Sequence, residues 1–480
     1  MRSVKNNYLY SLAYQLLAII IPIITTPYVS RVLGATALGD YNYTLGIVTY
    51  FGIFVLTGTH SFGQREIAAR SYNQHDRSVK FFEILLFRII CFLAVFLLYL
   101  CFVIFVNTNY KTLFLIHIIS FFSWILDISW YYQGVEKFKY IVLRNTIVKV
   151  VATCLIFSVV KTSDDLLKYA LILVGSTFLG NCTFWIRIKK EIICVKLKDL
   201  DVLGNFHGIM QLFIPVIAIQ VYTVLDQIMI GYLANTTEVG YYSQGEKIIK
   251  LSLTIISALS VVLLPRVSNL YSNRKFTEIQ ELYKKSLYFL FIIAEPMLIG
   301  CIVIAPLFVP VFYGAGFEPV QSVLRVLSLL FVVLSIGQLY GSFLVAIKKQ
   351  SLYSKAVVVA AIVNFCLNFI LIYYMKLGAV GASIGTVVSE TVSSAIQVIG
   401  AKDVFNPNTI FYCLKKYILP SCFMGIVLYL IMILLPVSFW GLLFAILIAV
   451  SSYLIILMIN KDEVCLEIIS LIVGKLKSKI

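Results

Sequence analysis

Two lysines and a glutamate lie together in an apolar stretch of the sequence. Residues 241–265 contain Glu246, Lys247 and Lys250, and a charge at the centre of a membrane span costs about 2.5–3.5 kcal/mol. Because Glu246 and Lys250 are four residues apart, a helix places them on one face in the favourable order for an ion pair. The lysines could attract an anion inside a membrane; alternatively, Glu246 and Lys250 only neutralise one another. Arg31, at the outer end of another apolar stretch, is a second anion-attracting candidate, or it lies at the wet interface.

Three carboxyl groups in apolar stretches are candidate coupling-ion or gating sites. Asp226 could bind a proton or a sodium ion, or it could form an ion pair with a cation of the following helix. Glu295 precedes a proline and could instead satisfy backbone groups that the proline leaves free. Glu390 could bind a coupling ion, or it could be held by Asn364 and Asn368 in a hydrogen-bonded contact between helices.

Two prolines, Pro22 and Pro27, interrupt the first apolar stretch. Proline inside a helix removes a backbone hydrogen bond and permits a bend. The pair therefore predicts either a gate in this helix or a kink that serves only packing.

Three further cations, Arg88, Lys149 and Arg325, lie about one and a half to two turns inside their apolar stretches. Long basic side chains at this depth usually extend to the lipid headgroups. We therefore expect Arg88 and Lys149 to reach the cytoplasmic headgroups and Arg325 the outer ones. The alternative is that they line a polar cavity.

The composition indicates that these residues belong to a membrane protein. Of 480 residues, 60% are hydrophobic and only 13% are charged, whereas soluble domains are about 45–50% apolar and about 25% charged. This excludes a soluble enzyme, a nucleic-acid-binding domain and a disordered chain. A spanning helix needs about 20 apolar residues, and the sequence predicts an all-α integral membrane protein with fourteen of them. The predicted spans are 8–33, 42–62, 81–106, 112–133, 141–160, 166–186, 207–233, 241–265, 286–312, 319–346, 352–374, 379–400, 414–436 and 438–459.

The distribution of basic residues predicts the orientation. Lysine and arginine number 39 against 23 aspartate and glutamate, a net charge of +16. If the N-terminus is cytoplasmic, most of the lysines and arginines between spans fall on the cytoplasmic side, as the positive-inside rule requires. We therefore predict that the N-terminus and the C-terminus are both cytoplasmic.

The connections between the spans are too short for a soluble catalytic domain. The longest, 187–206 and 266–285, have about twenty residues, and no GxxxxGK[ST] segment is present. Most of the ten cysteines lie in apolar runs, and the four histidines are far apart. We therefore predict no metal site and no cofactor, apart from a coupling ion.

Similar segments recur at a constant spacing in the two halves of the chain. GDY at 39–41 corresponds to GYY at 240–242, and Arg65 in the following loop corresponds to Arg266. Because both segments open a span of the same orientation, we predict two six-helix lobes related by a pseudo-two-fold axis along the membrane normal. The predicted division is a first lobe at 1–200, a second lobe at 201–405, and two additional helices with a cytoplasmic tail at 406–480.

Short motifs follow one another along nearly the whole chain. They are TPYVSRVLG at 26–34, LGDYNY at 38–43, GQREIA at 63–68, WYYQG at 130–134, DQIMIG at 226–231, VGYY at 239–242, LPR at 264–266, FYGAGF at 312–317 and GAVGA at 378–382. In this order they resemble the polysaccharide-transport branch of the multidrug/oligosaccharidyl-lipid/polysaccharide exporter superfamily, which includes the Wzx-type flippases. The last two spans carry no such motif.

The resemblance implies two lobes around a central cavity. It also implies translocation of undecaprenyl-diphosphate-linked oligosaccharide units across the bacterial cytoplasmic (inner) membrane, for O-antigen or capsule synthesis. Arg31, Lys247 and Lys250, with Glu246, would then face the diphosphate. Membrane lipid is an expected partner, as are glycosyltransferases and a polymerase of the same pathway; nucleic acid is not.

There are two alternatives to a flippase, one from the same superfamily and one from another class of protein. A cation-coupled multidrug exporter of the same superfamily is one, although fourteen spans and a basic eighth span count against it. An integral-membrane glycosyltransferase or polymerase is the other, but the sequence contains no metal-binding carboxylate pair and no sizeable external loop. We therefore expect a transporter and not an enzyme.

Overall fold

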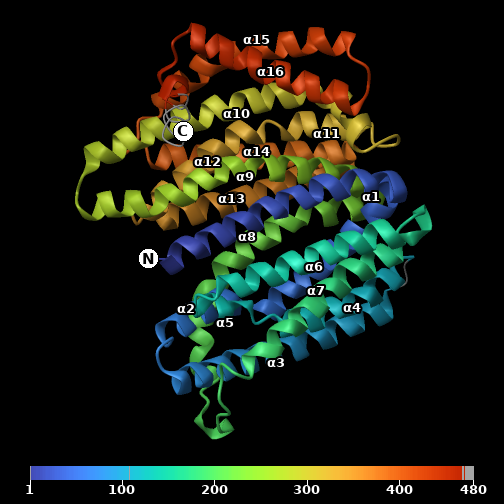
Figure 1. The fold of residues 1–480 in the computed structure, drawn as a ribbon, viewed down its shortest axis with the longest axis vertical. Helices are drawn as coiled ribbons and strands as arrows, with labels where there is room; N and C mark the ends of the chain where they lie inside the picture. Colours follow the sequence, from blue (N-terminus) through green and yellow to red (C-terminus); the bar gives the residue numbers. More distant parts are fainter. Residues whose placement is uncertain (1, 107–108, 468–469, 471–480) are drawn as a thin grey trace. The chain divides into compact units, whose positions relative to one another are not determined.

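The computed structural model shows helices joined by short connections, and the residues it describes form no β-strand (Figure 1). The described residues are 2–106, 109–467 and 470. The end of the predicted tail, 471–480, therefore lies outside them. Contacts within the chain define two compact units, Met1–Tyr232 and Leu233–Ile480.

The described residues of the first unit form eight α-helices, the last of which ends at the boundary. They are α1 (Arg2–Leu56), α2 (Thr59–Ala69), α3 (Gln74–Phe105), α4 (Lys111–Leu126), α5 (Ser129–Gly134), α6 (Phe138–Val159), α7 (Leu166–Ile188) and α8 (Phe206–Leu233). Thus α8 belongs to the first unit, although the predicted lobe boundary at 200 assigns it to the second. The three-part division itself stays a prediction.

The second unit contains the remaining helices. They are α9 (Thr236–Ser272), α10 (Phe276–Phe312), α11 (Val320–Leu327), α12 (Leu330–Ala346), α13 (Gln350–Asn368), which continues as a π-helical turn (Phe369–Tyr374), α14 (Gly378–Gly400), α15 (Asn408–Leu434) and α16 (Phe439–Ile459).

Eleven helical stretches among the described residues are long and apolar enough to cross a membrane. The first, Leu16–Ala69, contains most of the predicted span 8–33 and the whole of 42–62. The predicted spans 207–233 and 241–265 correspond to α8 and α9, which are not among the eleven. The protein is thus a multi-pass membrane protein, whereas the count of fourteen spans and the orientation stay predictions.

The long helix α1 is interrupted at Gly34, between the first two predicted spans. Gly34 has φ 76° and ψ 174°, a backbone conformation that is strongly unfavourable for residues other than glycine. Pro22 and Pro27 lie within the helical part. The departure from helical geometry therefore occurs at Gly34, and a gating role of the prolines stays a prediction.

The predicted span 112–133 corresponds to the apolar helical stretch Lys111–Gly134, within which the backbone leaves the helix between α4 and α5. Such a break leaves carbonyl groups without helical partners. Side chains of α7 bind two of them: Asn181 donates to the carbonyl of Ser123 at 2.9 Å, and Trp185 donates to that of Leu126 at 2.9 Å.

Arg88 of α3 binds the same break. Its guanidinium donates to the carbonyls of Trp124 and Asp127 and, at 3.0 Å, to the hydroxyl of Thr59. The residue is only 1% exposed. The expectation that Arg88 extends to the headgroups is therefore wrong, because this side chain stabilises a helix break inside the first unit.

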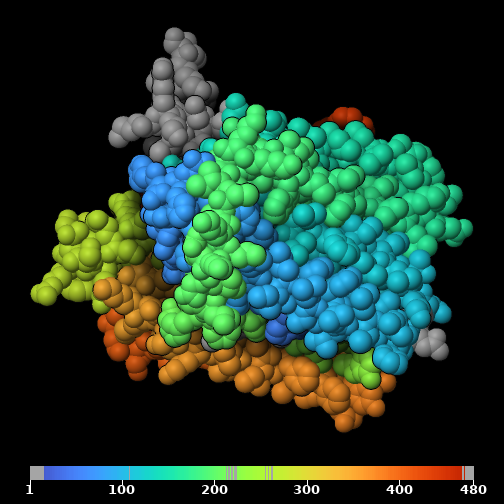
Figure 2. All heavy atoms as spheres, turned by 90° about the horizontal axis from the view of Figure 1, so that it is seen from below, coloured from blue at the N-terminus to red at the C-terminus, as the bar shows by residue number. Residues whose placement is uncertain are grey.

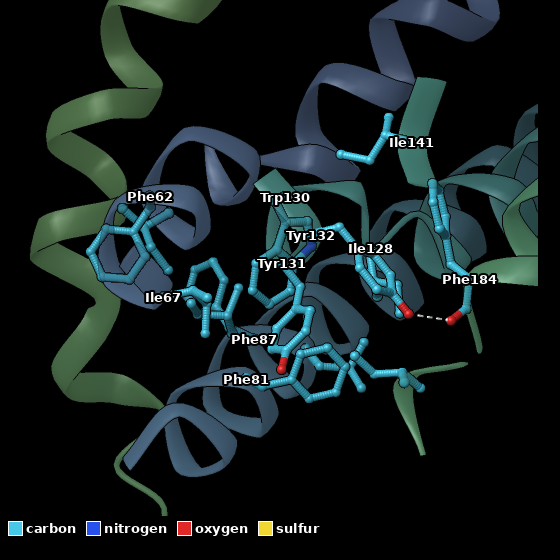
Figure 3. Packing of buried hydrophobic residues seen from close by; sticks show 14 residues of the cluster. Phe62, Ile67, Phe81, Phe87, Ile128, Trp130, Tyr131, Tyr132, Ile141 and Phe184 are labelled. Carbon is cyan, nitrogen blue, oxygen red and sulfur yellow. Dashed lines mark hydrogen bonds between the residues drawn. The ribbon is translucent and has the colours of Figure 1, made fainter. Parts of the chain in front are cut away.

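An aromatic cluster joins two of the family motifs (Figure 3). Trp130 and Tyr132 are fully buried, and the Tyr132 hydroxyl donates to the carbonyl of Phe184 at 2.7 Å (Figure 3). A Cβ atom at Gly63 would lie 2.4 Å from the Trp130 ring, and one at Gly134 would lie 2.8 Å from α2. The motifs at 63–68 and 130–134 therefore form a packing contact.

The segment between α7 and α8 is fixed onto α3 by polar side chains. Glu83 accepts hydrogen bonds from the backbone N–H of Asp201 at 2.9 Å and from the amide of Asn205 at 3.0 Å. Lys80 pairs with Glu83 at 2.6 Å. The start of α8 then packs on α2, since a Cβ at Gly208 would lie 2.6 Å from a phenylalanine ring there. Figure 2 shows this green segment over the blue helices of the same unit.

In the second unit, α10 packs against α12, α15 and α16 (Figure 1). The motif at 312–317 ends α10, where Gly314 and Gly316 adopt φ values of 91° and 85°. Tyr313 of this motif donates to the carbonyl of Gln244 on α9 at 2.8 Å. The end of α10 is therefore tied to the part of α9 that carries the charged residues.

We predict that Gly63→Ala destabilises the protein by about 1–3 kcal/mol, because the new methyl group must displace Trp130. Gly175→Ala is the matched control: it lies in α7 with nothing within 4 Å of a Cβ, and alanine favours a helix by up to about 1 kcal/mol. Thermal unfolding of the detergent-purified variants would measure both effects. Equal melting temperatures for Gly63→Ala and the wild type would contradict the packing role.

Candidate functional site

The charged residues of α9 form one ion pair and leave one lysine outside it. Lys250 contacts Glu246 at 2.7 Å, and its side chain is 58% exposed while that of Glu246 is 14% exposed. Lys247 is half-buried and makes no hydrogen bond or ion pair with the rest of the described chain. The ion pair was the purely structural alternative for Glu246 and Lys250, and it leaves Lys247 as the unneutralised charge of this cluster. An anion-binding role stays a prediction.

Asp226 is buried, 4% exposed, in the final turns of α8. It lies within electrostatic range of the Tyr50 hydroxyl on α1. Small residues bring these two helices together: a Cβ at Gly231 would lie 2.1 Å from the Tyr43 ring, and one at Gly46 would lie 3.3 Å from α8. The motif at 226–231 thus holds a carboxyl group against α1. Arg31, also on α1, is exposed.

Glu295 is the most deeply buried acid of the predicted set. It is 1% exposed, and neither carboxyl oxygen has a hydrogen-bond partner among the described residues. The expectation that it satisfies the backbone freed by Pro296 is wrong. That carbonyl belongs to Ile292 and accepts a hydrogen bond of 2.9 Å from the Tyr453 hydroxyl of α16. Glu295 therefore does not bind the backbone group that the proline leaves free, and it stays a candidate for proton binding.

Arg325 is exposed, yet it performs a similar function for a second proline. Its Nε donates to the carbonyl of Ile302 at 3.3 Å. In a regular helix this carbonyl would bond to the N–H of residue 306, which is a proline. Arg325 therefore binds a backbone group that Pro306 leaves free. Lys149 is half-buried on α6, and its role as a cavity-lining residue stays a prediction.

The asparagines of α13 bond to one another. The side-chain amide of Asn368 donates to that of Asn364 at 3.2 Å, and both residues are fully buried. Gly385 of α14 allows this contact, because a Cβ there would lie 2.2 Å from the Asn368 oxygen. Glu390 is half-buried and lies within electrostatic range of Tyr353. The predicted Glu390–asparagine contact stays a prediction.

The first unit contains a cavity that the sequence did not indicate. It has a volume of about 490 Å³ and is lined by residues of α1, α4 and α7, by Gly58 in the turn after α1, and by one side chain of α8. The lining residues are Tyr41, Leu45, Thr49, Gly52, Ile53, Leu56, Gly58, Ser120, Ser123, Trp124, Leu173, Val174, Thr177 and Gln220. Serines and threonines in membrane helices are so common that their types alone carried no signal.

The second unit contains an apolar cavity of about 550 Å³. Residues of α10, α15 and α16 form much of its wall, including Pro296, Met424 and Tyr453. The two helices without family motifs therefore help to enclose a hydrophobic space beside α10.

Solved structures define the class of this fold. The lipid II flippase MurJ, in an inward closed conformation, aligns with a TM-score of 0.75 at 18% identity, covering 95% of this chain and all of that one. A multidrug resistance MATE family transporter of the MOP superfamily, in an inward-facing conformation, aligns with a TM-score of 0.60 at 15% identity, covering 83% of this chain and 99% of that one. The fold is therefore like that of these two proteins.

The sequence comparisons identify the family. The profile described as "Polysaccharide biosynthesis protein" matches residues 4–271, and this chain belongs to that family. The MatE profile matches residues 212–370. A candidate O-antigen transporter of Escherichia coli K12 is 23% identical over 82% of this chain and 96% of its own length. A protein assigned as a low-salt glycan biosynthesis flippase in Haloferax volcanii is 24% identical over 37% of each chain. The family resemblance of the motifs is confirmed.

We predict that Tyr453→Phe destabilises the protein by about 1–3 kcal/mol, because the carbonyl of Ile292 is left without a donor. In a Pro296→Ala background the helix supplies its own N–H, so the same substitution should cost much less. A double-mutant cycle of unfolding free energies in detergent would measure this coupling. Tyr429→Phe, on the exposed face of α15, is the control. Additive effects of Tyr453→Phe and Pro296→Ala would contradict the assignment.

Proposed function

We propose that this protein is a flippase that moves undecaprenyl-diphosphate-linked oligosaccharide units from the cytoplasmic to the outer leaflet, for O-antigen or capsule synthesis. The observation that carries the proposal is membership of the polysaccharide biosynthesis family, with an alignment to an O-antigen transporter over nearly that protein's whole length. The fold shared with a lipid II flippase supports the same class of transport. A transporter, and not an enzyme, accounts for these relatives.

The chemical problem in this reaction is the diphosphate. Its negative charges would be strongly opposed by the hydrocarbon, whereas the lipid tail can stay in the bilayer. We propose that the diphosphate and the glycan cross by alternating access through a cationic central cavity, with Lys247 as the principal counter-charge. Lys250 would also bind the diphosphate if the anion displaces Glu246 as its partner. Arg31 is a second candidate for the same role.

The energy source that fits this proposal is an ion gradient or the membrane potential. Moving one charge through the potential is worth about 2.3 kcal/mol per 100 mV. The buried carboxyl of Asp226 is the preferred coupling site for a proton or a sodium ion, and Glu295 and Glu390 are alternatives. Pro22 and Pro27 are the corresponding gating candidates on α1.

The cellular setting follows from the same proposal. The substrate is made on the cytoplasmic side, so the protein would act in the bacterial inner membrane. Glycosyltransferases that build the glycan and a polymerase that joins the units would act before and after it.

A multidrug exporter is the second candidate. The MatE profile covers part of the chain, and a multidrug transporter shares the fold. The basic residues of α9 count against this candidate, because cationic drugs are better bound by acidic groups. Efflux of a cationic dye without glycan movement would favour it.

We predict that the Lys247→Ala, Lys250→Ala double variant lowers flipping at least about tenfold, because the diphosphate loses its counter-charge. The measurement is protein-dependent loss of accessibility of a fluorescent undecaprenyl-diphosphate oligosaccharide in proteoliposomes.

The control for this experiment is Lys275→Ala. Lys275 is also in a glutamate pair, with Glu278 at 2.6 Å, and it is 54% exposed, so we expect an unchanged rate. Full flipping by the double variant, at equal membrane abundance, would reject the role of these lysines. No flipping of any lipid-linked glycan by the wild type would reject the proposed function.

We predict that Asp226→Asn removes the dependence of flipping on an imposed proton or sodium gradient. The neutral amide can neither take up a proton nor supply a negative charge to a sodium ion. The gradient response of the wild type and the variant is compared in the same vesicles. Asp164→Asn, at an exposed position, should keep the response. A gradient response of normal size in Asp226→Asn would exclude this carboxyl as the coupling site.

A further inference from the structure

The cavity of the first unit combines an aromatic ring with several hydroxyl groups and contains no charge. Its volume of about 490 Å³ lies within the range of small-molecule sites, about 300–1,000 Å³. Thr49, Ser120, Ser123 and Thr177 supply hydroxyl groups, and Gln220 supplies an amide. None of the described residues that line it carries an ionisable acid or base other than the phenol of a tyrosine.

The hydroxyl groups divide into donors and acceptors. Ser123 accepts a hydrogen bond of 2.9 Å from the amide of Asn181, which leaves its proton available. Ser120 makes no hydrogen bond within the described part of the chain, so its proton is also available. Thr49 and Thr177 donate to carbonyls of their own helices, at 2.7 Å and 2.9 Å, and therefore offer lone pairs.

An indole ring provides the apolar surface. Trp124 lines the cavity, and so does Gly52 of α1, where a Cβ would lie 2.6 Å from the Trp124 ring. Glycine at this position is what allows the indole to lie against α1. An aromatic ring beside a set of hydroxyl groups is the arrangement that suits a pyranose, whose C–H face is apolar and whose rim is hydroxylated.

A polar network behind the cavity holds these groups in place. Arg144 donates to the side-chain oxygen of Asn181 at 2.5 Å and to the carbonyl of Thr177 at 3.3 Å. Asn181 in turn donates to the carbonyl and to the hydroxyl of Ser123. The end of α4 is therefore fixed, with the Ser123 hydroxyl held at the cavity wall.

We propose that this cavity is a subsite for an uncharged sugar residue of the transported glycan. The proposal rests on the proposed flippase function and adds to it a location for the sugar and a class of sugar. The hydroxyl groups of the wall favour a ligand that has hydroxyl groups of its own, because a ligand without them leaves the wall groups unpaired and binds more weakly. The lining residues carry no charge, and the Arg144 guanidinium behind them is bound to Asn181 and Thr177. This disfavours a hexuronic acid, whose carboxylate would be desolvated without a direct counter-charge.

The test is saturation-transfer NMR of the detergent-solubilised full chain with single free sugars as probes. We expect transfer to the ring protons of at least one neutral hexose among glucose, galactose, rhamnose and N-acetylglucosamine, and none to glucuronate. Trp124→Ala should abolish the signal, and Ser120→Ala should weaken the Kd about five- to tenfold. Ser120→Ala removes a hydroxyl that bonds to no described residue, so the fold should not depend on it. Ser158→Ala, on the exposed face of α6, should keep full binding.

Several results would overturn the proposal. They are transfer to none of the neutral sugars, equal transfer to glucuronate, or unchanged binding in Trp124→Ala and Ser120→Ala. A loss in Trp124→Ala with no change in Ser120→Ala would also do so, because it would indicate an apolar occupant. The flipping assay separates this from the function: flipping without sugar binding rejects the subsite alone, whereas absence of flipping rejects the flippase.

Discussion

The structure depends on one constraint, which is that backbone polar groups within a membrane must find partners inside the protein. The helices satisfy most of them, and the exceptions are met by particular side chains. Tyr453 binds the carbonyl that Pro296 leaves free, and Arg325 binds the one left by Pro306. At the break between α4 and α5, Arg88 binds two further carbonyls. Three polar or charged side chains, Tyr453, Arg325 and Arg88, thus bind backbone carbonyls.

This constraint separates the ionisable residues into two groups. Arg88 and Arg325 are occupied by carbonyls, and Glu246 and Lys250 are occupied by one another. Lys247 and Glu295 make no such contacts with the described residues. A residue in an apolar environment without a structural task is a candidate for a functional one, and Lys247 and Glu295 therefore join the buried Asp226 as candidates.

Two pairs of the family motifs are explained by close packing between helices. Gly63 makes room for Trp130, and Gly231 makes room for Tyr43. In both cases a glycine in one motif receives an aromatic ring of another, and the helices approach closely. These motifs could be recognised in the sequence because close packing restricts the residue type. The hydroxyl groups around the cavity of the first unit could not, because serine and threonine are tolerated at many positions of a membrane helix.

The sequence alone determined the class of the protein, its helical nature and its family. These follow from composition, from the lengths of apolar runs and from residue types that are restricted wherever helices touch. Only the tertiary structure decided the functions of individual side chains. Whether Arg88 of α3 reaches the headgroups or a carbonyl depends on the position of the break between α4 and α5, which are other helices. The cavity near Trp124 likewise exists only because residues far apart in the chain meet there, and the spacing along the sequence does not encode those distances.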